Sequence, residues 1–85
     1  MSTVDEVPAL SYGQKQVGQT FNPSGKEEVN DIKIAAAALI DELNDQRSKA
    51  MSAGLSGEVL AQYTLGIRAA EDASYRGVKA ATWQH

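Results

Sequence analysis

The chain has no cysteine and one histidine, His85. The lack of cysteine excludes a disulfide framework, and one histidine is too few for a cysteine and histidine zinc site. A domain of 85 residues buries a modest share of its surface, and small domains are usually supported by disulfides, a metal or self-association. With the first two supports missing, we expect a compact homo-oligomer.

No apolar run approaches the roughly 20 residues that a membrane-spanning helix needs. Residues 1–10 are acidic and have neither the basic nor the apolar region of a signal peptide. We therefore expect a cytoplasmic protein with no membrane partner. The net charge of −3, from eleven acidic and eight basic residues, argues against a DNA or RNA partner, although a local pocket can still hold a small anion.

Proline occurs only at positions 8 and 23, and runs of strand-forming residues are absent. Together with the abundant alanine, these absences predict an all-α fold. A short helix of about two turns is expected within residues 10–17, bounded by Pro8 and Gly18. We assign residues 1–9 as an N-terminal tail and residues 10–85 as one helical-hairpin domain.

The first long helix is predicted to begin at Ser24, which forms a capping-box pattern with Glu27 three residues later. Apolar residues at spacings of three and four then predict one buried stripe: Val29, Ile32, Ala36, Leu39, Ile40 and Leu43. Ser52-Ala53-Gly54 is typical of a helix end.

The second long helix is predicted from about Ser56 to about Thr82. Its buried stripe has the same spacing: Leu60, Tyr63, Ile67, Ala70, Ser74, Gly77 and Ala81. The short connection at 54–57 predicts that the two long helices form an antiparallel hairpin. A hairpin cannot cover both of its faces, so we expect it to pack against copies of itself. The alternative is a monomer in which the short helix covers the hairpin.

Catalytic groupings are hard to find in this sequence. Serine and threonine lack an obvious activating base. Adjacent carboxylates point about 100° apart on a helix and usually face solvent; the pairs are Glu27/Glu28, Asp41/Glu42 and Glu71/Asp72. We expect a protein that is not an enzyme and uses no cofactor.

The segment from Asn22 to Lys26 is the strongest candidate for binding an anion. It lies at a predicted helix N-terminus, where unpaired backbone N–H groups and the helix dipole attract negative charge. Ser24 is the predicted N-cap, Gly25 allows close approach to the backbone, and Lys26 adds a positive charge. The alternative is an ordinary helix cap beside a solvated lysine.

Two further residues are candidates for ligand contact. Tyr12 can stack on a nucleobase, an interaction of about 1–3 kcal/mol per base, or it can simply anchor the N-terminal segment. Arg68 can contact phosphate if symmetry gathers several copies, but its default interpretation is an ion pair with Glu71 or Asp72, at i+3 and i+4.

Several segments of the chain resemble the hairpin domain of the phage anti-CBASS cyclic-oligonucleotide sponges. The segments are 21–26 (FNPSGK), 29–33 (VNDIK), 37–41 (AALID), 67–71 (IRAAE) and 78–82 (VKAAT). The resemblance covers most of residues 10–83, and its most specific part is the Asn-Pro-Ser-Gly helix start. CBASS is a bacterial defence that signals infection with cyclic nucleotides.

The resemblance implies a protein of the host cell cytoplasm that assembles as a homo-hexamer of helical hairpins. Members bind cyclic dinucleotides such as cyclic GMP–AMP between protomers without cleaving them, and some bind cyclic trinucleotides at separate sites. Tyr12 matches the base-stacking tyrosine, Lys26 the phosphate-contacting lysine, and Arg68 an arginine of the trinucleotide site. Glu28 departs from the pattern, because an acid near that second site would repel phosphate.

Other functions stay open at this point. A small structural or adaptor phage protein would form the same oligomer without nucleotide affinity. A helix-turn-helix DNA-binding regulator is disfavoured by the long helices, the turn and the acidic charge. A cyclic-nucleotide phosphodiesterase would release cleaved product.

Overall fold

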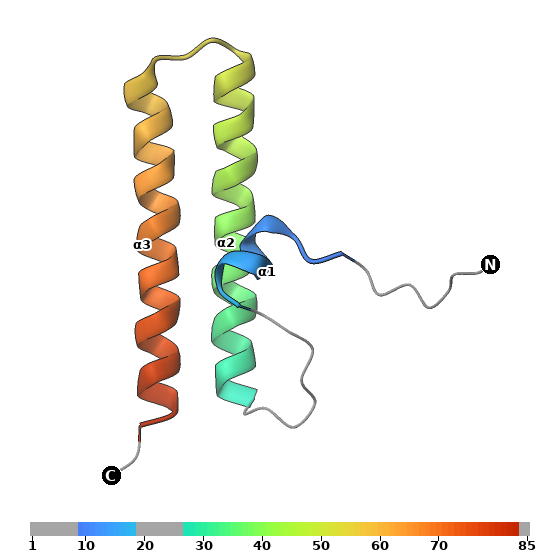
Figure 1. Ribbon diagram of the computed structural model, residues 1–85, viewed down its shortest axis with the longest axis vertical. Helices are drawn as coiled ribbons and strands as arrows, with labels where there is room; N and C mark the ends of the chain where they lie inside the picture. The colour runs from blue at the N-terminus through green and yellow to red at the C-terminus, as the bar shows by residue number, and fades with distance from the viewer. Residues whose placement is uncertain (1–8, 19–26, 84–85) are drawn as a thin grey trace, which may run out of the picture.

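A computed structural model of the chain describes residues 9–18 and 27–83. These residues form three helices and no strand: α1 (Tyr12–Gln16), α2 (Glu27–Ser52) and α3 (Gly57–Ala81). Figure 1 shows α2 and α3 side by side as an antiparallel hairpin, with α1 lying against α2. The predicted all-α hairpin with a short first helix is confirmed, and the homo-oligomer stays a prediction.

The connection between the long helices is a short turn with a cap on each side. Gly54 has a φ of +73°, a left-handed conformation that glycine adopts without steric cost. The Gly54 N–H donates to the Met51 carbonyl and the Leu55 N–H to the Ala50 carbonyl, both at 3.0 Å, which is the Schellman pattern that ends a helix. Ser56 then caps α3 by accepting the Val59 N–H. Both predicted helix boundaries are confirmed.

The core is a narrow seam between α2 and α3. Its centre is formed by Ile40 and Ile67, which are 0% and 2% exposed. Ala70 completes this cluster, and Leu43 packs against it while partly buried. Such a seam is thin, because only a few side chains exclude water completely.

The predicted buried stripe of α2 is wrong at one residue, Leu39. Leu39 is 51% exposed, although it precedes the fully buried Ile40. Consecutive helical residues point about 100° apart, and α3 packs against the side of α2 that carries Ile40. Leu39 is left at the edge of the seam.

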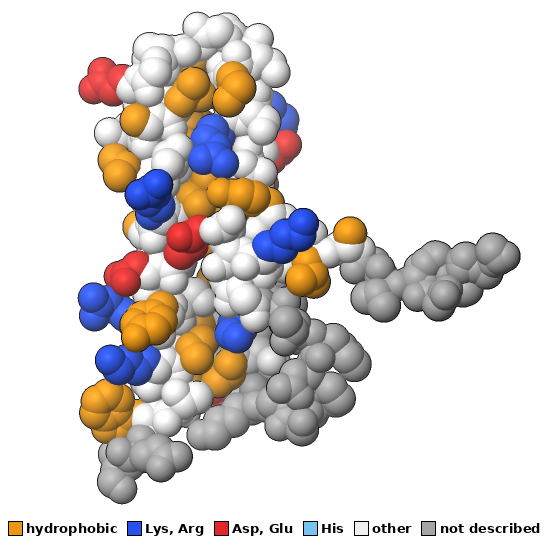
Figure 2. All heavy atoms as spheres, in the orientation of Figure 1, with side chains coloured by type: hydrophobic (Ala, Val, Ile, Leu, Met, Phe, Trp, Pro, Cys, Tyr) orange, Lys and Arg blue, Asp and Glu red, His pale blue; other side chains and the backbone are white. Residues whose placement is uncertain are grey.

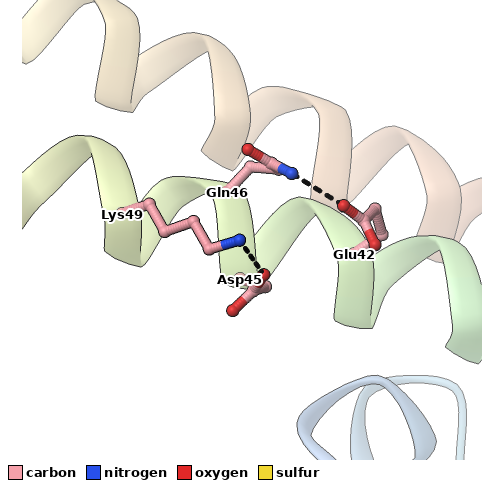
Figure 3. Close-up of polar contacts among 4 residues, drawn as sticks. All are labelled: Glu42, Asp45, Gln46 and Lys49. Carbon is pink, nitrogen blue, oxygen red and sulfur yellow. Dashed lines mark hydrogen bonds and ion pairs between the residues drawn. The ribbon is translucent and has the colours of Figure 1, made fainter.

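The outer surface of α2 carries polar pairs at i,i+4 spacing (Figure 3). The Gln46 amide donates to Glu42 at 2.8 Å, and Lys49 lies 3.1 Å from Asp45. The Lys49 and Asp45 side chains are 68% and 58% exposed, so their ion pair contributes only about 0.3–0.5 kcal/mol. These pairs support α2 locally and hold no other element.

An uncharged groove runs between the long helices. It has a volume of about 300 Å³ and is lined by Ile32, Ala35, Ala36, Leu39, Ala70, Ala73 and Ser74. Helical periodicity places Leu39 on the side of α2 opposite to Asp41, the residue that contacts α1. The hairpin therefore has one face that carries α1 and another that is apolar. No described helix is long and apolar enough to cross a membrane.

Candidate functional site

Helix α1 is short, and its first turn is fixed by local hydrogen bonds. Ser11 Oγ accepts the Gln14 N–H at 3.1 Å, and Gln14 Oε1 accepts the Ser11 N–H at 2.8 Å. This reciprocal capping box satisfies two N–H groups that a helix start leaves unpaired. It fixes the backbone that carries Tyr12.

Gly13 docks α1 directly on α2. Its N–H donates to Asp41 Oδ1 at 2.6 Å, a short bond to a charged acceptor. A Cβ atom at position 13 would overlap the Ala37 carbonyl group, so only glycine permits this close approach. The contact brings α1 against the middle of α2 and places the Tyr12 ring near α3.

Arg47 connects all three helices. Its guanidinium donates to Asn44 Oδ1 at 2.7 Å on α2 and to Thr64 Oγ1 at 3.1 Å on α3. The guanidinium carbon lies 5.7 Å from the centroid of the Tyr12 ring, within the range of a cation–π contact. Tyr12 is 37% exposed, so part of this residue remains accessible to a ligand.

These contacts border a hollow of about 440 Å³ to which each helix contributes. The lining residues are Tyr12, Gln16, Arg47, Thr64, Ile67, Arg68 and Glu71. Figure 2 shows the α1 side of the molecule, where Lys and Arg side chains lie among acidic ones. The hollow combines an aromatic ring, two guanidinium groups and one carboxylate, which suits a flat ligand that carries negative charge.

Arg68 is exposed and forms no ion pair with a residue of the described ranges. The sequence-based pairing with Glu71 or Asp72 is therefore wrong. Asp72 instead pairs with Arg76 at 3.0 Å, because an acid four residues before a base is the more favourable order on a helix. The Arg68 guanidinium is left for the hollow.

Two of the six predicted ligand-binding residues, Tyr12 and Arg68, come together in this hollow. The other four lie outside the described residues: Asn22, Ser24, Gly25 and Lys26. Within one chain, α2 begins at Glu27, about 30 Å along the helix axis from Arg47 at 1.5 Å per residue. The hollow and the described start of α2 are therefore separate regions of a protomer.

The acid that faces the hollow is Glu71, which lines it while partly buried. Glu28, expected to weaken a second site, is exposed in the first turn of α2. It lies about 28 Å along the helix from Arg47. Among the described residues of one chain, Glu71 is the acid that would repel a ligand phosphate in the hollow.

Arg47 and Thr64 are site residues that sequence reasoning missed. A signal for Arg47 was present, because it continues the buried spacing Ile40, Leu43, Arg47, Ala50. A charged residue at a stripe position requires partners for its donors, and Thr64 is one of them. That partner could not be identified before the register of α2 against α3 was known.

Within residues 9–18 and 27–83, no three His, Cys, Asp or Glu side chains are grouped so as to hold a metal ion. The chemistry that the hollow offers is stacking and anion binding. Comparisons with protein-family models, with curated proteins and with solved structures found no match to this chain.

Proposed function

We propose that this protein binds cyclic oligonucleotide second messengers in the host cell cytoplasm and sequesters them without cleavage, which blocks CBASS signalling. The observation that carries the proposal is that Tyr12 and Arg68 line one hollow. The sequence singled out these residues separately, one for stacking and one for phosphate. Their proximity gives both interactions to a single ligand.

The ligand's chemistry matches these groups. A cyclic dinucleotide has flat bases and two phosphates in an approximately two-fold arrangement. The Tyr12 ring can stack on a base, and the free Arg68 guanidinium can form paired hydrogen bonds with a phosphate. Two copies of the chain related by symmetry would offer two matching sets of these groups.

The proposed complete pocket lies between protomers. The hollow of one chain would be joined there by the Asn22–Lys26 segment of another, since α2 begins about 30 Å along the helix from Arg47. In this arrangement Lys26 supplies a second positive charge, and the hollow supplies the stacking ring. The resemblance places the counterpart of Arg68 at a separate trinucleotide site, and we propose that Arg68 contacts the dinucleotide phosphate as well, because it shares the hollow with Tyr12. Cyclic trinucleotides would use Arg68 groups gathered by the same symmetry.

Self-association is supported by the exposed apolar surface. Among the described residues, nine large apolar side chains are exposed, whereas five apolar side chains, three of them alanine, are buried. The uncharged groove around Leu39 adds a continuous apolar face. We propose that a second copy of the chain covers this face, because one hairpin buries too little to be stable alone.

The direct test is calorimetric titration with 3′,3′-cyclic GMP–AMP. Wild-type protein is expected to bind, Tyr12→Ala to bind at least about fivefold more weakly because stacking is lost, and Tyr12→Phe to stay close to wild type. Arg68→Ala is expected to weaken binding as well. If both alanine variants bound the ligand as tightly as the wild-type protein, a site in this hollow would be contradicted.

The second candidate is a small structural or adaptor phage protein. The apolar groove favours it, because this face can serve assembly without any ligand. It predicts the same oligomer and no heat with any cyclic di- or trinucleotide. The titration above therefore separates the two functions.

A further inference from the structure

We infer that Arg47 is a positioning residue of this site: it sets where the Tyr12 ring stands, and Arg68 is left as the group that contacts ligand phosphate. The two arginines that line the same hollow thus have different roles. The effect of Arg47 on ligand binding rests on the proposed function. The effect of Arg47 on the position of the Tyr12 ring concerns the free protein and can be tested without a ligand.

The first evidence is how Arg47 is held. Its two terminal nitrogens donate to different helices, Nη2 to Asn44 on α2 and Nη1 to Thr64 on α3. The acceptor Thr64 is itself oriented, since its hydroxyl donates to the Leu60 carbonyl at 3.1 Å. A planar guanidinium held at two points has a fixed orientation, and these donors are not available to a ligand unless the bonds break.

The second evidence is that Arg47 contacts the Tyr12 ring beyond the backbone anchor of α1. Helix α1 has five residues, too few to be stable without tertiary contacts. Gly13 anchors its backbone through Asp41, but the ring direction is set beyond that anchor. The Arg47 guanidinium, 5.7 Å from the ring centroid, connects the ring to the α2–α3 seam.

The third evidence is the contrast with Arg68. Arg68 lines the same hollow and is exposed, with no ion-pair partner in the described part of the chain. An unpaired guanidinium can turn to a phosphate without breaking an existing contact. Within the described hollow, Arg68 is therefore the residue that contacts the ligand phosphate, and Arg47 is the residue that positions the Tyr12 ring.

The test compares Arg47→Gln, Arg47→Lys and Arg68→Gln in the full chain. NMR spectra with labelled tyrosine follow the Tyr12 ring, and Tyr12→Phe assigns its signals. We expect Arg47→Gln to shift these signals in the free protein and Arg68→Gln to leave them in place. Arg47→Lys keeps the charge but cannot bond Asn44 and Thr64 in the same planar geometry, so it is expected to shift them as well.

Binding of 3′,3′-cyclic GMP–AMP is then measured at several salt concentrations. Both glutamine variants are expected to bind about tenfold more weakly: Arg47→Gln because it disturbs the stacking ring, and Arg68→Gln because it removes a charge-assisted hydrogen bond to phosphate. Arg68→Gln should flatten the dependence of affinity on salt more than Arg47→Gln does, because Arg68→Gln removes a direct phosphate contact as well as a positive charge of the hollow. Full rescue by Arg47→Lys, or a salt dependence flattened equally by Arg47→Gln, would overturn the positioning role.

Two controls keep the outcomes decisive. If Arg47→Gln does not fold, Asn44→Ala removes one acceptor, leaves Arg47 in place and is expected to shift the Tyr12 signals in the same direction. If wild-type protein binds no cyclic nucleotide, the proposed function fails. The free-protein spectra still decide the inference: displaced Tyr12 signals support the role of Arg47, and unchanged signals overturn it.

Discussion

At the scale of single residues, the side chains of the hollow differ in whether they already have partners. Arg47 is bonded to Asn44 and Thr64, whereas Arg68 has no ion pair among the described residues. Glu71 is the one carboxylate that the described part of the chain contributes to the lining. A ligand phosphate beside Arg68 would therefore be attracted by the charges of Arg68 and Arg47 and repelled by that of Glu71.

Glu71→Gln is expected to strengthen binding of a phosphate ligand, because it removes the repulsive charge and keeps the side chain's size. An exposed charge pair is worth about 0.2–1 kcal/mol, so we expect a tightening of up to about fivefold by calorimetry. Asp72→Asn is the matched control, since it changes the net charge equally but lies outside the lining. Equal tightening in both variants would assign the effect to net charge and not to the hollow.

Gly13→Ala is expected to displace α1, because the new methyl group would overlap the Ala37 carbonyl. The protein should stay helical and lose ligand affinity to the extent that Tyr12→Ala does. Circular dichroism and calorimetry check the two parts. Gly66→Ala is the control, because a methyl group there makes only an ordinary contact, 3.5 Å from Leu43. An affinity unchanged by Gly13→Ala would contradict the docking of α1 as a requirement for binding.

The sequence predicts part of the site because Tyr12 and Arg68 have chemistry that is visible residue by residue. It does not predict that they share a hollow, since that depends on Gly13 approaching the α2 backbone and on the pairing of Asp72 with Arg76. The approach of Gly13 is set by tertiary packing, and the pairing of Asp72 is set by competition between Arg68 and Arg76. The segment from Asn22 to Lys26 lies outside the described residues, so its role stays a prediction.

At the scale of helices, the end of α2 and the start of α3 are encoded locally. Gly54 and Ser56 fix the turn through backbone geometry and a side-chain cap, which is why these boundaries follow from the sequence. The buried face is predicted less well. The spacing rule includes Leu39, but the direction of α3 leaves it exposed.

Gly54→Ala is expected to destabilise the fold by about 1 kcal/mol, because alanine is strained at a φ of +73°. Urea unfolding at constant protein concentration measures the change in the free energy of unfolding. Gly57→Ala is the matched control in the same turn: nothing lies near its added methyl group, and alanine favours the first turn of α3. A Gly54→Ala protein as stable as the control would contradict the role of the left-handed cap.

At the scale of the whole molecule, the hairpin presents two different faces. One carries α1 and the hollow, and the other carries the uncharged groove around Leu39. Under the proposed function, the hollow would bind the ligand together with the Asn22–Lys26 segment of another copy, and the groove would associate with a further copy. Because each hairpin has a thin core, assembly and stability are expected to depend on each other.

Leu39→Glu is expected to weaken self-association, because it places a charge in the apolar groove. Light scattering should show a shift toward the mass of a single chain. Leu65→Glu is the matched control, since Leu65 is 57% exposed and does not line the groove. An oligomer that survives Leu39→Glu and dissociates with Leu65→Glu would place the interface elsewhere.

Recovery of the ligand after capture is the decisive measurement of sequestration. Purified protein in molar excess is mixed with 3′,3′-cyclic GMP–AMP, free ligand is separated by filtration, and the retained fraction is heated and chromatographed. Sequestration predicts that free ligand falls sharply and that heating returns it intact and in full. Free ligand that stays at its starting concentration, or cleaved product after heating, would contradict sequestration.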